Sequence, residues 1–155
     1  MNGLSNIKYV NFKEIESKDW NLIVKEFKGS IFYTYDMMEY LASFSPKYIT
    51  ENHSFAIFEG KKPIAIVPIF LDVDDKKSKF SYNDIPVFSP IFALDLSKKI
   101  VMKLLKLIFK FVNELAVQKK VIGGNFQIDP MMDIRTNFYP YYFNFFMIDD
   151  YNTKD

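Results

Sequence analysis

Residues His53–Leu71 read HSFAIFEGKKPIAIVPIFL, and this stretch decides the fold. Two runs rich in β-forming residues, Ser54–Phe58 and Pro63–Leu71, flank the glycine-containing turn sequence Glu59-Gly60-Lys61-Lys62, which predicts a β-hairpin. Apolar residues occupy both parities of the second run, so we expect both faces of that strand to be covered. Pro68 cannot donate a ladder hydrogen bond, which indicates an edge, a bulge or a strand that splays from its neighbour.

The residues before the hairpin predict a strand and two helices. The strand is expected at Ile7–Phe12. The first helix should begin at Ser17 as N-cap and stop at Gly29; its buried face comprises Trp20, Ile23, Val24 and Phe27. Asp36 is expected to cap a short second helix that Pro46 closes, and the apolar residues at helical spacing in it are Met37, Tyr40, Leu41 and Phe44.

The residues after the hairpin complete a mixed pattern of helix and strand. Asp72–Lys79 reads as a charged loop, and the longest helix should run from an N-cap at Ser97 to about Lys119. One side of this helix is apolar, with Ile100, Val101, Leu104, Leu105, Ile108, Phe111, Val112 and Leu115, and the other carries Lys99, Lys103, Lys106 and Lys110. Strands are expected at Val121–Ile128 and Tyr141–Ile148. The order predicts an α/β (α+β) fold: a mixed, largely antiparallel sheet flanked by helices.

Composition sets the class of protein. The 155 residues suffice for one domain, which we expect to span residues 1–148, followed by a polar tail at 149–155. A net charge of +1 gives little attraction for duplex nucleic acid. The absence of cysteine excludes disulfides, thiolate nucleophiles and cysteine-ligated zinc. There is no apolar run long enough for a membrane span and no secretory h-region near the start, so we expect a cytoplasmic protein.

Few side chains carry recognisable chemistry. His53 is the single histidine, so one chain cannot build a two-histidine metal site; a surface or capping role is the ordinary interpretation, and a general base the alternative. Asp72, Asp74 and Asp75 resemble the start of a calcium loop, but Lys77 and Asn83 stand where glycine and glutamate are needed, which favours a solvated loop. We expect no metal site.

Three further patterns each have a structural and a functional interpretation. The pair Gly123-Gly124 marks a bulge or tight packing more often than a ligand contact. The lysine stripe of the long helix is typical of a solvated face, with an acidic partner, phosphate or membrane surface as the alternative. The aromatic run from Tyr139 to Phe146 alternates like a strand buried on both sides, and stacking on bases or sugars is the alternative.

Two segments carry a family resemblance. Ser30-Ile31-Phe32-Tyr33-Thr34-Tyr35-Asp36-Met37-Met38-Glu39-Tyr40-Leu41 resembles the opening motif of Fem-type and related GNAT-like acyltransferases, with Met37 where an aromatic residue, usually Trp, is expected. The strand, turn and proline-bearing strand from Phe55 to Ile69 are similar to the arrangement that follows in that family. The long helix, the strand ending Ile128-Asp129-Pro130 and the last aromatic strand fit in order, so the resemblance covers roughly residues 15 to 150.

The resemblance implies a single GNAT-like lobe, because members of the family carry two such lobes in about twice this length. The family's pyrophosphate loop is absent: Leu94-Asp95-Leu96-Ser97 precedes the long helix, without glycine and with an aspartate. We therefore expect a lobe of an N-acyltransferase that transfers an acyl or aminoacyl group to an amine. It should bind no cofactor alone and depend on a second lobe, partner chain or homo-oligomer for the acyl-CoA or aminoacyl donor.

Two alternatives stay open. The first is a non-catalytic protein- or glycan-interaction domain that kept the fold and lost the chemistry. The second is a self-contained small GNAT enzyme, in which Glu39, Glu59, Asp129 or a tyrosine serves as base, although spacing singles out none of them and the catalytic residue stays unknown. An open cleft at the edge of Ala65–Leu71 would favour that second alternative.

Overall fold

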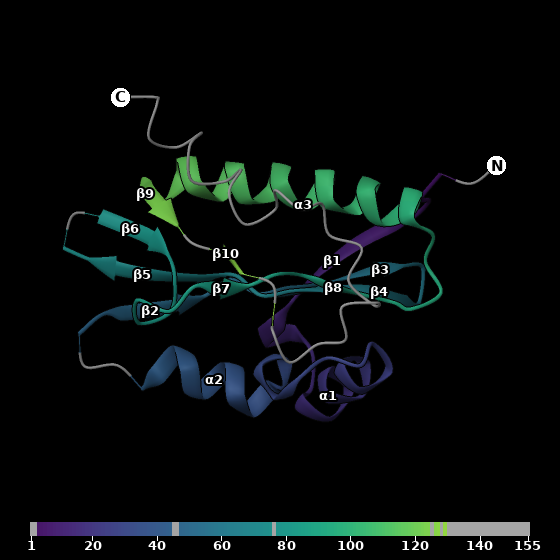
Figure 1. The fold of residues 1–155 in the computed structure, drawn as a ribbon, viewed down its shortest axis with the longest axis horizontal. Coiled ribbons are helices and arrows are strands. Elements are labelled where there is room, and N and C mark those ends of the chain that lie inside the picture. Colours follow the sequence, from purple (N-terminus) through teal and green to yellow (C-terminus); the bar gives the residue numbers. More distant parts are fainter. Residues whose placement is uncertain (1–2, 45–46, 76, 125, 128, 130–155) are drawn as a thin grey trace.

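The computed structural model describes residues 3–44, 47–75, 77–124, 126–127 and 129. They form an α+β fold in three layers, with strands in the middle, one long helix on one side and two shorter helices on the other (Figure 1). Most strand pairs are antiparallel, and two are parallel. The mixed, largely antiparallel sheet flanked by helices is therefore confirmed.

The elements are named in chain order. The helices are α1 (Ser17–Glu26), α2 (Tyr35–Ser43) and α3 (Lys98–Gln118), with short 3₁₀ turns η1 (Phe12–Glu14) and η2 (Ile31–Tyr33). The first strands are β1 (Ile7–Asn11), β2 (Ile49–Asn52), β3 (Phe55–Glu59), β4 (Lys62–Val67) and β5 (Phe70–Asp74). The later strands are β6 (Lys77–Phe80), β7 (Val87–Phe88), β8 (Ile91–Phe92), β9 (Val121–Gly124) and β10 (Phe126–Gln127).

The predicted hairpin forms the turn end of one long antiparallel ribbon. Strand β3 pairs with β4 around a turn at Gly60, whose φ of 61° suits glycine, and β2 pairs with β5 in the same register. Asn52 faces Phe70 and Phe55 faces Val67, so the interruption between the two halves leaves the register unchanged. At the interruption the His53 N–H donates to the Ile69 carbonyl at 2.8 Å. Residues 49–74 thus form a single ribbon that belongs to two sheets.

The two sheets part beside Pro68. Strand β8 pairs with β4 as far as Ile66, which faces Ile91, and extending that register would bring Pro68 opposite Ser89. Pro68 has no N–H to donate, and the Ser89 carbonyl accepts instead from the Tyr33 hydroxyl at 2.8 Å. From Phe70 onward the ribbon has β6 as its neighbour. Of the three roles predicted for Pro68, the structure shows the strand that splays from its neighbour. We call the place where β8 and β6 part on either side of Pro68 the Pro68 fork.

The helix ends correct two of the predicted caps. Glu16 and Thr34 occupy the N-cap positions of α1 and α2, so Ser17 lies inside the first helix and Asp36 in the first turn of the second. Ser97 caps α3 as predicted, accepting from the Ile100 N–H at 3.3 Å. Beyond α1, Lys28 adopts the left-handed conformation with φ 53°. Gly29 follows it, where a Cβ atom would lie 2.8 Å from Ile91 Cδ1, so close packing explains this glycine.

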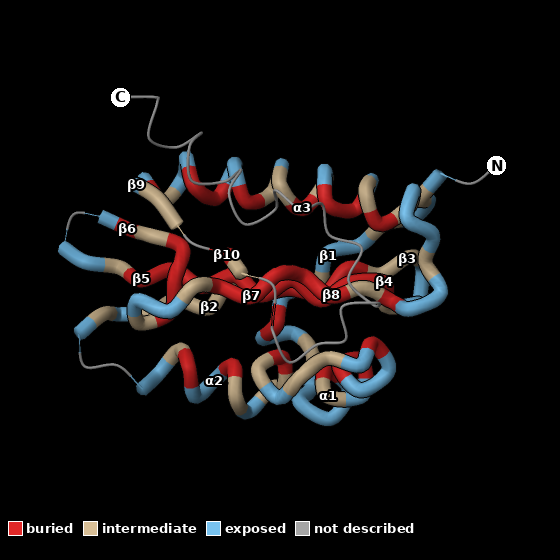
Figure 2. Tube along the Cα trace, in the orientation of Figure 1, coloured by how far each residue is buried: buried red, intermediate tan, exposed pale blue. Residues whose placement is uncertain are grey.

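The core fills both sides of the ribbon (Figure 2). The predicted buried faces of α1 and α3 are confirmed, with Ile100 and Phe111 partly buried. The short helix α2 differs: it buries Met38 and Leu41, while Tyr40 and Phe44 are 57% and 41% exposed. Of the four apolar residues at helical spacing, Leu41 is thus buried and Met37 packs against the core, whereas Tyr40 and Phe44 face outward.

Two predicted segments divide differently. The expected charged loop at Asp72–Lys79 is wrong, because β5 and β6 form a second hairpin there and Asp72 is buried. The expected strand at Val121–Ile128 becomes β9, parallel to β6, and β10, parallel to β7. Pro46, the predicted strand Tyr141–Ile148, the aromatic run from Tyr139 to Phe146 and the tail at 149–155 lie outside the described residues.

Candidate functional site

An open groove of about 880 Å³ lies along the outer edge of β2. Strand β1 pairs with β3 as far as Asn11, and the Phe12 N–H still reaches the Ser54 carbonyl at 2.9 Å before the chain turns into η1. Strand β2 continues the line of β3 but has only β5 beside it among the described strands. The groove lies beside β2, at the position that β1 would occupy if it continued along the sheet edge. We call it the His53 groove. Its lining residues are Asn11, Phe12, Lys13, Glu39, Ala42, Ser43, Thr50, Glu51, Asn52, His53 and Lys119.

His53 is held in the groove at both its backbone and its ring. Its N–H is bonded to Ile69 at the interruption of the ribbon, and its Nε2 lies 2.6 Å from Glu51 Oε2. The two side chains meet because residues two apart in a strand point to the same face. Sequence reasoning preferred a surface or capping role for His53, and the partly buried ring beside a carboxylate now favours the acid–base alternative.

Glu51 also contacts a residue that is distant in the sequence. The Lys119 Nζ, just beyond the end of α3, lies 3.2 Å from Glu51 Oε2. Hydrogen bonding to His53, and then to Lys119, holds the pKa of the Glu51 carboxyl below its ordinary value. Glu51 is therefore ionised near neutral pH and can fix the orientation of the imidazole. No sequence pattern singles out Glu51 or Lys119, although the spacing of Glu51 and His53 in a predicted strand is a usable signal.

Two more charged side chains line the groove. Glu39, one of the candidate bases, lies near Tyr35; desolvation, and then the charge of Glu39, raises the pKa of that phenol. Lys13 is exposed and makes no ion pair with the described part of the chain. The groove thus offers a carboxylate-oriented imidazole together with an ammonium group that pairs with no described carboxylate.

The other candidate bases lie elsewhere. Glu59 is at the end of β3, where its carboxylate accepts from the Ser5 N–H at 3.1 Å. Asp129 is buried and accepts from the Ser30 hydroxyl. Its charge also adds to the effect of burial in raising the pKa of Tyr82 well above the ordinary value for a phenol. These two residues neither line the His53 groove nor contact one another.

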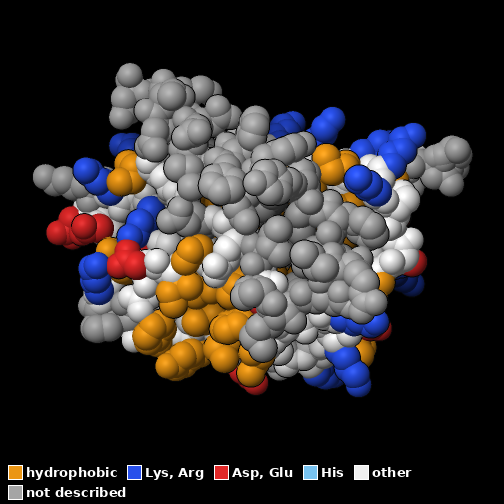
Figure 3. Space-filling view, in the orientation of Figure 1, with side chains coloured by type: hydrophobic (Ala, Val, Ile, Leu, Met, Phe, Trp, Pro, Cys, Tyr) orange, Lys and Arg blue, Asp and Glu red, His pale blue; other side chains and the backbone are white. Residues whose placement is uncertain are grey.

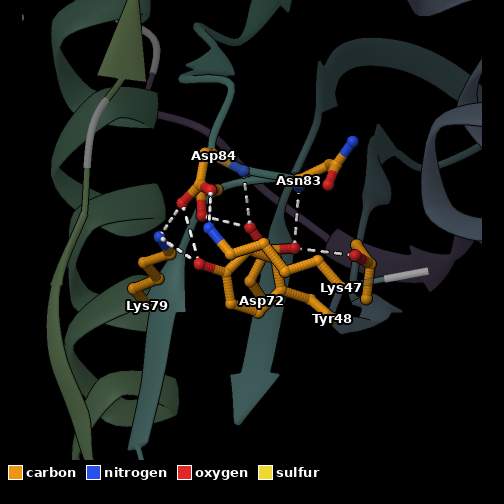
Figure 4. Close-up of polar contacts among 8 residues, drawn as sticks. Lys47, Tyr48, Asp72, Lys79, Asn83 and Asp84 are labelled. Carbon is orange, nitrogen blue, oxygen red and sulfur yellow. Dashed lines mark hydrogen bonds and ion pairs between the residues drawn. The ribbon is translucent and has the colours of Figure 1, made fainter. Parts of the chain in front are cut away.

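Asp72 and Asp84 form a polar cluster with a structural role (Figure 4). The buried Asp72 carboxylate accepts from Thr50 Oγ1 at 2.7 Å and Ser81 Oγ at 2.5 Å, and from the N–H groups of Asn83 and Asp84 at 2.8 and 3.0 Å. The latter two residues have φ of 54° and 64°, as a type I′ turn requires. Asp72 therefore holds a turn in place, and its expected solvated position is wrong.

Asp84 pairs with two lysine side chains on the outside of the same cluster. Its carboxylate accepts from the Lys47 Nζ at 2.8 Å, from the Lys79 Nζ, and from the Tyr48 hydroxyl at 3.2 Å. These bonds hold the pKa of Asp84 well below its ordinary value. Asp74 and Asp75 are exposed, and groups of three or more His, Cys, Asp or Glu side chains able to hold a metal do not occur among the described residues.

Three carboxylates with lowered pKa values, one of them Asp84 of this cluster, predict a loss of stability in acid. Asp84, Glu51 and Asp95 all have lowered pKa values in the folded state, so the stability that they contribute is present above the unfolded carboxyl pKa of about 4. It is lost as the pH falls through the lower folded values. Urea unfolding between pH 7 and pH 3 should show this decline, and Asp84→Asn should flatten it, because asparagine tolerates the turn conformation but carries no charge.

The matched control for the acid series is Asp75→Asn. Asp75 is also exposed, makes no ion pair with the described residues, and should leave the slope of stability against pH unchanged. An Asp84→Asn slope equal to that of the unmodified protein would contradict the assignment.

The lysine stripe and one glycine of the Gly123-Gly124 pair have structural explanations. Lys99, Lys103, Lys106 and Lys110 are exposed on α3, in keeping with a solvated face. At Gly124 a Cβ atom would lie 2.5 Å from Phe80 Cβ, whereas one at Gly123 would meet nothing within 4 Å, so tight packing explains the second glycine alone. Across the described ranges, no helix is both long and apolar enough to cross a membrane.

Comparison with known proteins adds no relative: no family model, curated protein or solved structure matches this chain.

Proposed function

We propose that this chain is a GNAT-like lobe of a Fem-type N-acyltransferase, which transfers an acyl or aminoacyl group to an amine. The observation that carries the proposal is the Pro68 fork, where the neighbours of a proline-bearing strand part and the ribbon enters two sheets. The order of elements around it supports the same assignment, with a strand, two helices and the hairpin followed by a long helix and a strand. A cytoplasmic location belongs to the proposal, supported by the absence of cysteine.

The filled state of the fork supports placing the acyl donor on a second lobe or partner chain. Side chains from the ribbon, α3 and β10 pack into the fork and leave a cavity of about 10 Å³, far below the volume of a ligand site. The start of α3 is also poorly suited to a pyrophosphate. The Ile100 N–H donates to Ser97, and Asp95 lies just before the helix, where it pairs with Lys62 at 2.5 Å.

Titration calorimetry with acetyl-CoA tests the division of labour. We expect no binding heat with this chain alone, because the described fork leaves no room for a thioester arm. The second measurement is amine acylation after the chain is mixed with the product of the reading frame that follows its gene, which we expect to encode a second GNAT-like lobe. Tight binding by the single chain, with turnover of an amine, would overturn the proposal of a partner-dependent lobe.

One observation favours a second candidate, a non-catalytic interaction domain. Hydrophobic side chains gather over α2 on one face of the molecule (Figure 3). Tyr40 in this helix and Phe44 at its C-cap stack with ring centroids 5.4 Å apart, and both are exposed. If the following reading frame encodes no second lobe and no acylation is found, while Tyr40→Ser with Phe44→Ser abolishes binding to a protein partner, this second candidate replaces the first.

A further inference from the structure

We propose that the His53 groove binds the acceptor, an amine that also carries an anionic group, and that His53 accepts the proton of its ammonium. This inference rests on the proposed acyl transfer for its purpose, but its binding step can be measured without any acyl donor. The bond to Ile69 holds the His53 backbone beside β2, and Glu51 holds the imidazole in a groove of about 880 Å³. That volume is typical of small-molecule sites.

The contacts of the imidazole assign the two ring nitrogens. Nε2 lies 2.6 Å from the ionised Glu51 carboxylate, so Nε2 carries the hydrogen and donates it. Nδ1 of the neutral ring then has the lone pair and is the nitrogen able to accept a proton. Glu51 also stabilises the imidazolium that forms, and Lys119 at 3.2 Å keeps Glu51 in place. Glu51 and Lys119 are thus positioning residues for His53.

The charges of the groove indicate the class of ligand. The Glu51 carboxylate is satisfied by His53 and Lys119, and the Glu39 carboxylate lies close enough to the Tyr35 phenol to contribute to raising its pKa, for which desolvation is the larger cause. The Lys13 ammonium group makes no ion pair in the described part of the chain. An anionic group on the ligand would pair with this ammonium group. An amine that bears a carboxylate or phosphate matches this arrangement better than a simple alkylamine does.

The chemical step balances with an acyl thioester or aminoacyl ester as donor. His53 Nδ1 takes one proton from the acceptor ammonium and leaves a neutral amine. The amine nitrogen forms a bond to the acyl carbon while the bond from that carbon to the donor's sulfur or oxygen breaks. The departing thiolate or alkoxide takes the surplus proton of the new amide nitrogen and leaves as a thiol or alcohol, and the imidazolium returns its proton to solvent.

Because His53 is the single histidine, nitrogen-15 NMR of its ring reports on the groove without overlap. The probes are 6-aminohexanoate, hexylamine and hexanoate, which carry both groups, the amine alone and the carboxylate alone. We expect saturable ring shifts with 6-aminohexanoate and at least tenfold weaker binding of the other two. Lys13→Gln should remove the advantage of 6-aminohexanoate over hexylamine, while the exposed-lysine control Lys110→Gln should keep it.

The positioning role has its own spectroscopic readout. Glu51→Gln should convert the single Nε2–H form of His53 into a mixture of tautomers, whereas the exposed-residue control Glu114→Gln should leave the ring signals unchanged. Ring signals that no probe moves, or equal binding of all three, would overturn the inference. Binding at His53 without acyl transfer by any pair of lobes would leave the groove assignment intact and remove the proposed function.

Discussion

Replacing Asp72 by alanine is expected to lower the free energy of unfolding by about 3–5 kcal/mol, the largest effect of any single change considered for this chain. The carboxylate is buried and accepts four hydrogen bonds, two from side-chain hydroxyls and two from the backbone of the turn at Asn83 and Asp84. Alanine leaves these donors without their acceptor. It also frees two non-glycine residues at positive φ from the group that holds them.

Chemical denaturation of Asp72→Ala beside Asp74→Ala measures the effect. Asp74 lies on the same strand and is exposed, so its replacement should change stability by less than about 0.5 kcal/mol. Asp72→Asn should fall between the two, because its amide oxygen still accepts while its amide N–H₂ faces the donors. Equal stability of the Asp72 and Asp74 variants would show that the cluster does not hold the turn.

Replacing Gly124 by alanine is expected to cost about 1–3 kcal/mol, the second largest effect. The new Cβ would lie 2.5 Å from Phe80 Cβ, and that atom is fixed to the backbone of β6 rather than at the end of a flexible side chain. Strands β6 and β9 would have to separate, which disturbs their parallel pairing. The Phe80 ring, whose centroid lies 5.6 Å from that of Phe126, would be displaced as well.

The neighbouring glycine is the matched control for this change. A Cβ at Gly123 meets nothing within 4 Å, so Gly123→Ala should change the free energy of unfolding by less than about 0.5 kcal/mol. Thermal unfolding of the two variants side by side gives the comparison. A Gly123 variant as unstable as the Gly124 variant would point to a backbone cause instead of crowding.

The features predictable from sequence are those with local signals. The turn at Gly60, the Ser97 cap and the apolar face of α3 each depend on residues within a few positions, and all three occur as predicted. The signal at Pro68 indicated a departure from regular pairing without deciding among edge, bulge and splay. The splayed arrangement depends on Tyr33, whose hydroxyl donates to the Ser89 carbonyl in place of the N–H that Pro68 lacks. Tyr33 is distant from Pro68 in the sequence.

Less of the candidate site than of the fold could be predicted from the sequence. His53 could be noticed because it is the single histidine, but its role depends on Lys119 and on the place where β1 leaves the sheet. The burial of Asp72 likewise depends on the hydroxyls of Thr50 in β2 and Ser81 just after β6, and on two N–H groups of the turn at Asn83 and Asp84. Charge composition alone therefore predicted a solvated loop where the chain buries a carboxylate.

The register that β2–β5 and the first three pairs of β3–β4 share across the bond from His53 to Ile69 has a consequence for how the protein unfolds. Two sheets built on separate strands could open independently, each with its own protection against hydrogen exchange. Here every residue pair of one half fixes the alignment of the other through the bond from His53 to Ile69. Both sheets should therefore lose amide protection together, as one cooperative unit. A one-residue slip in the pairs that Phe55–Ile57 make with β4 would also reverse the faces of His53 and Glu51, so the geometry of the groove depends on this part of the hairpin, beyond the register shift at Phe58.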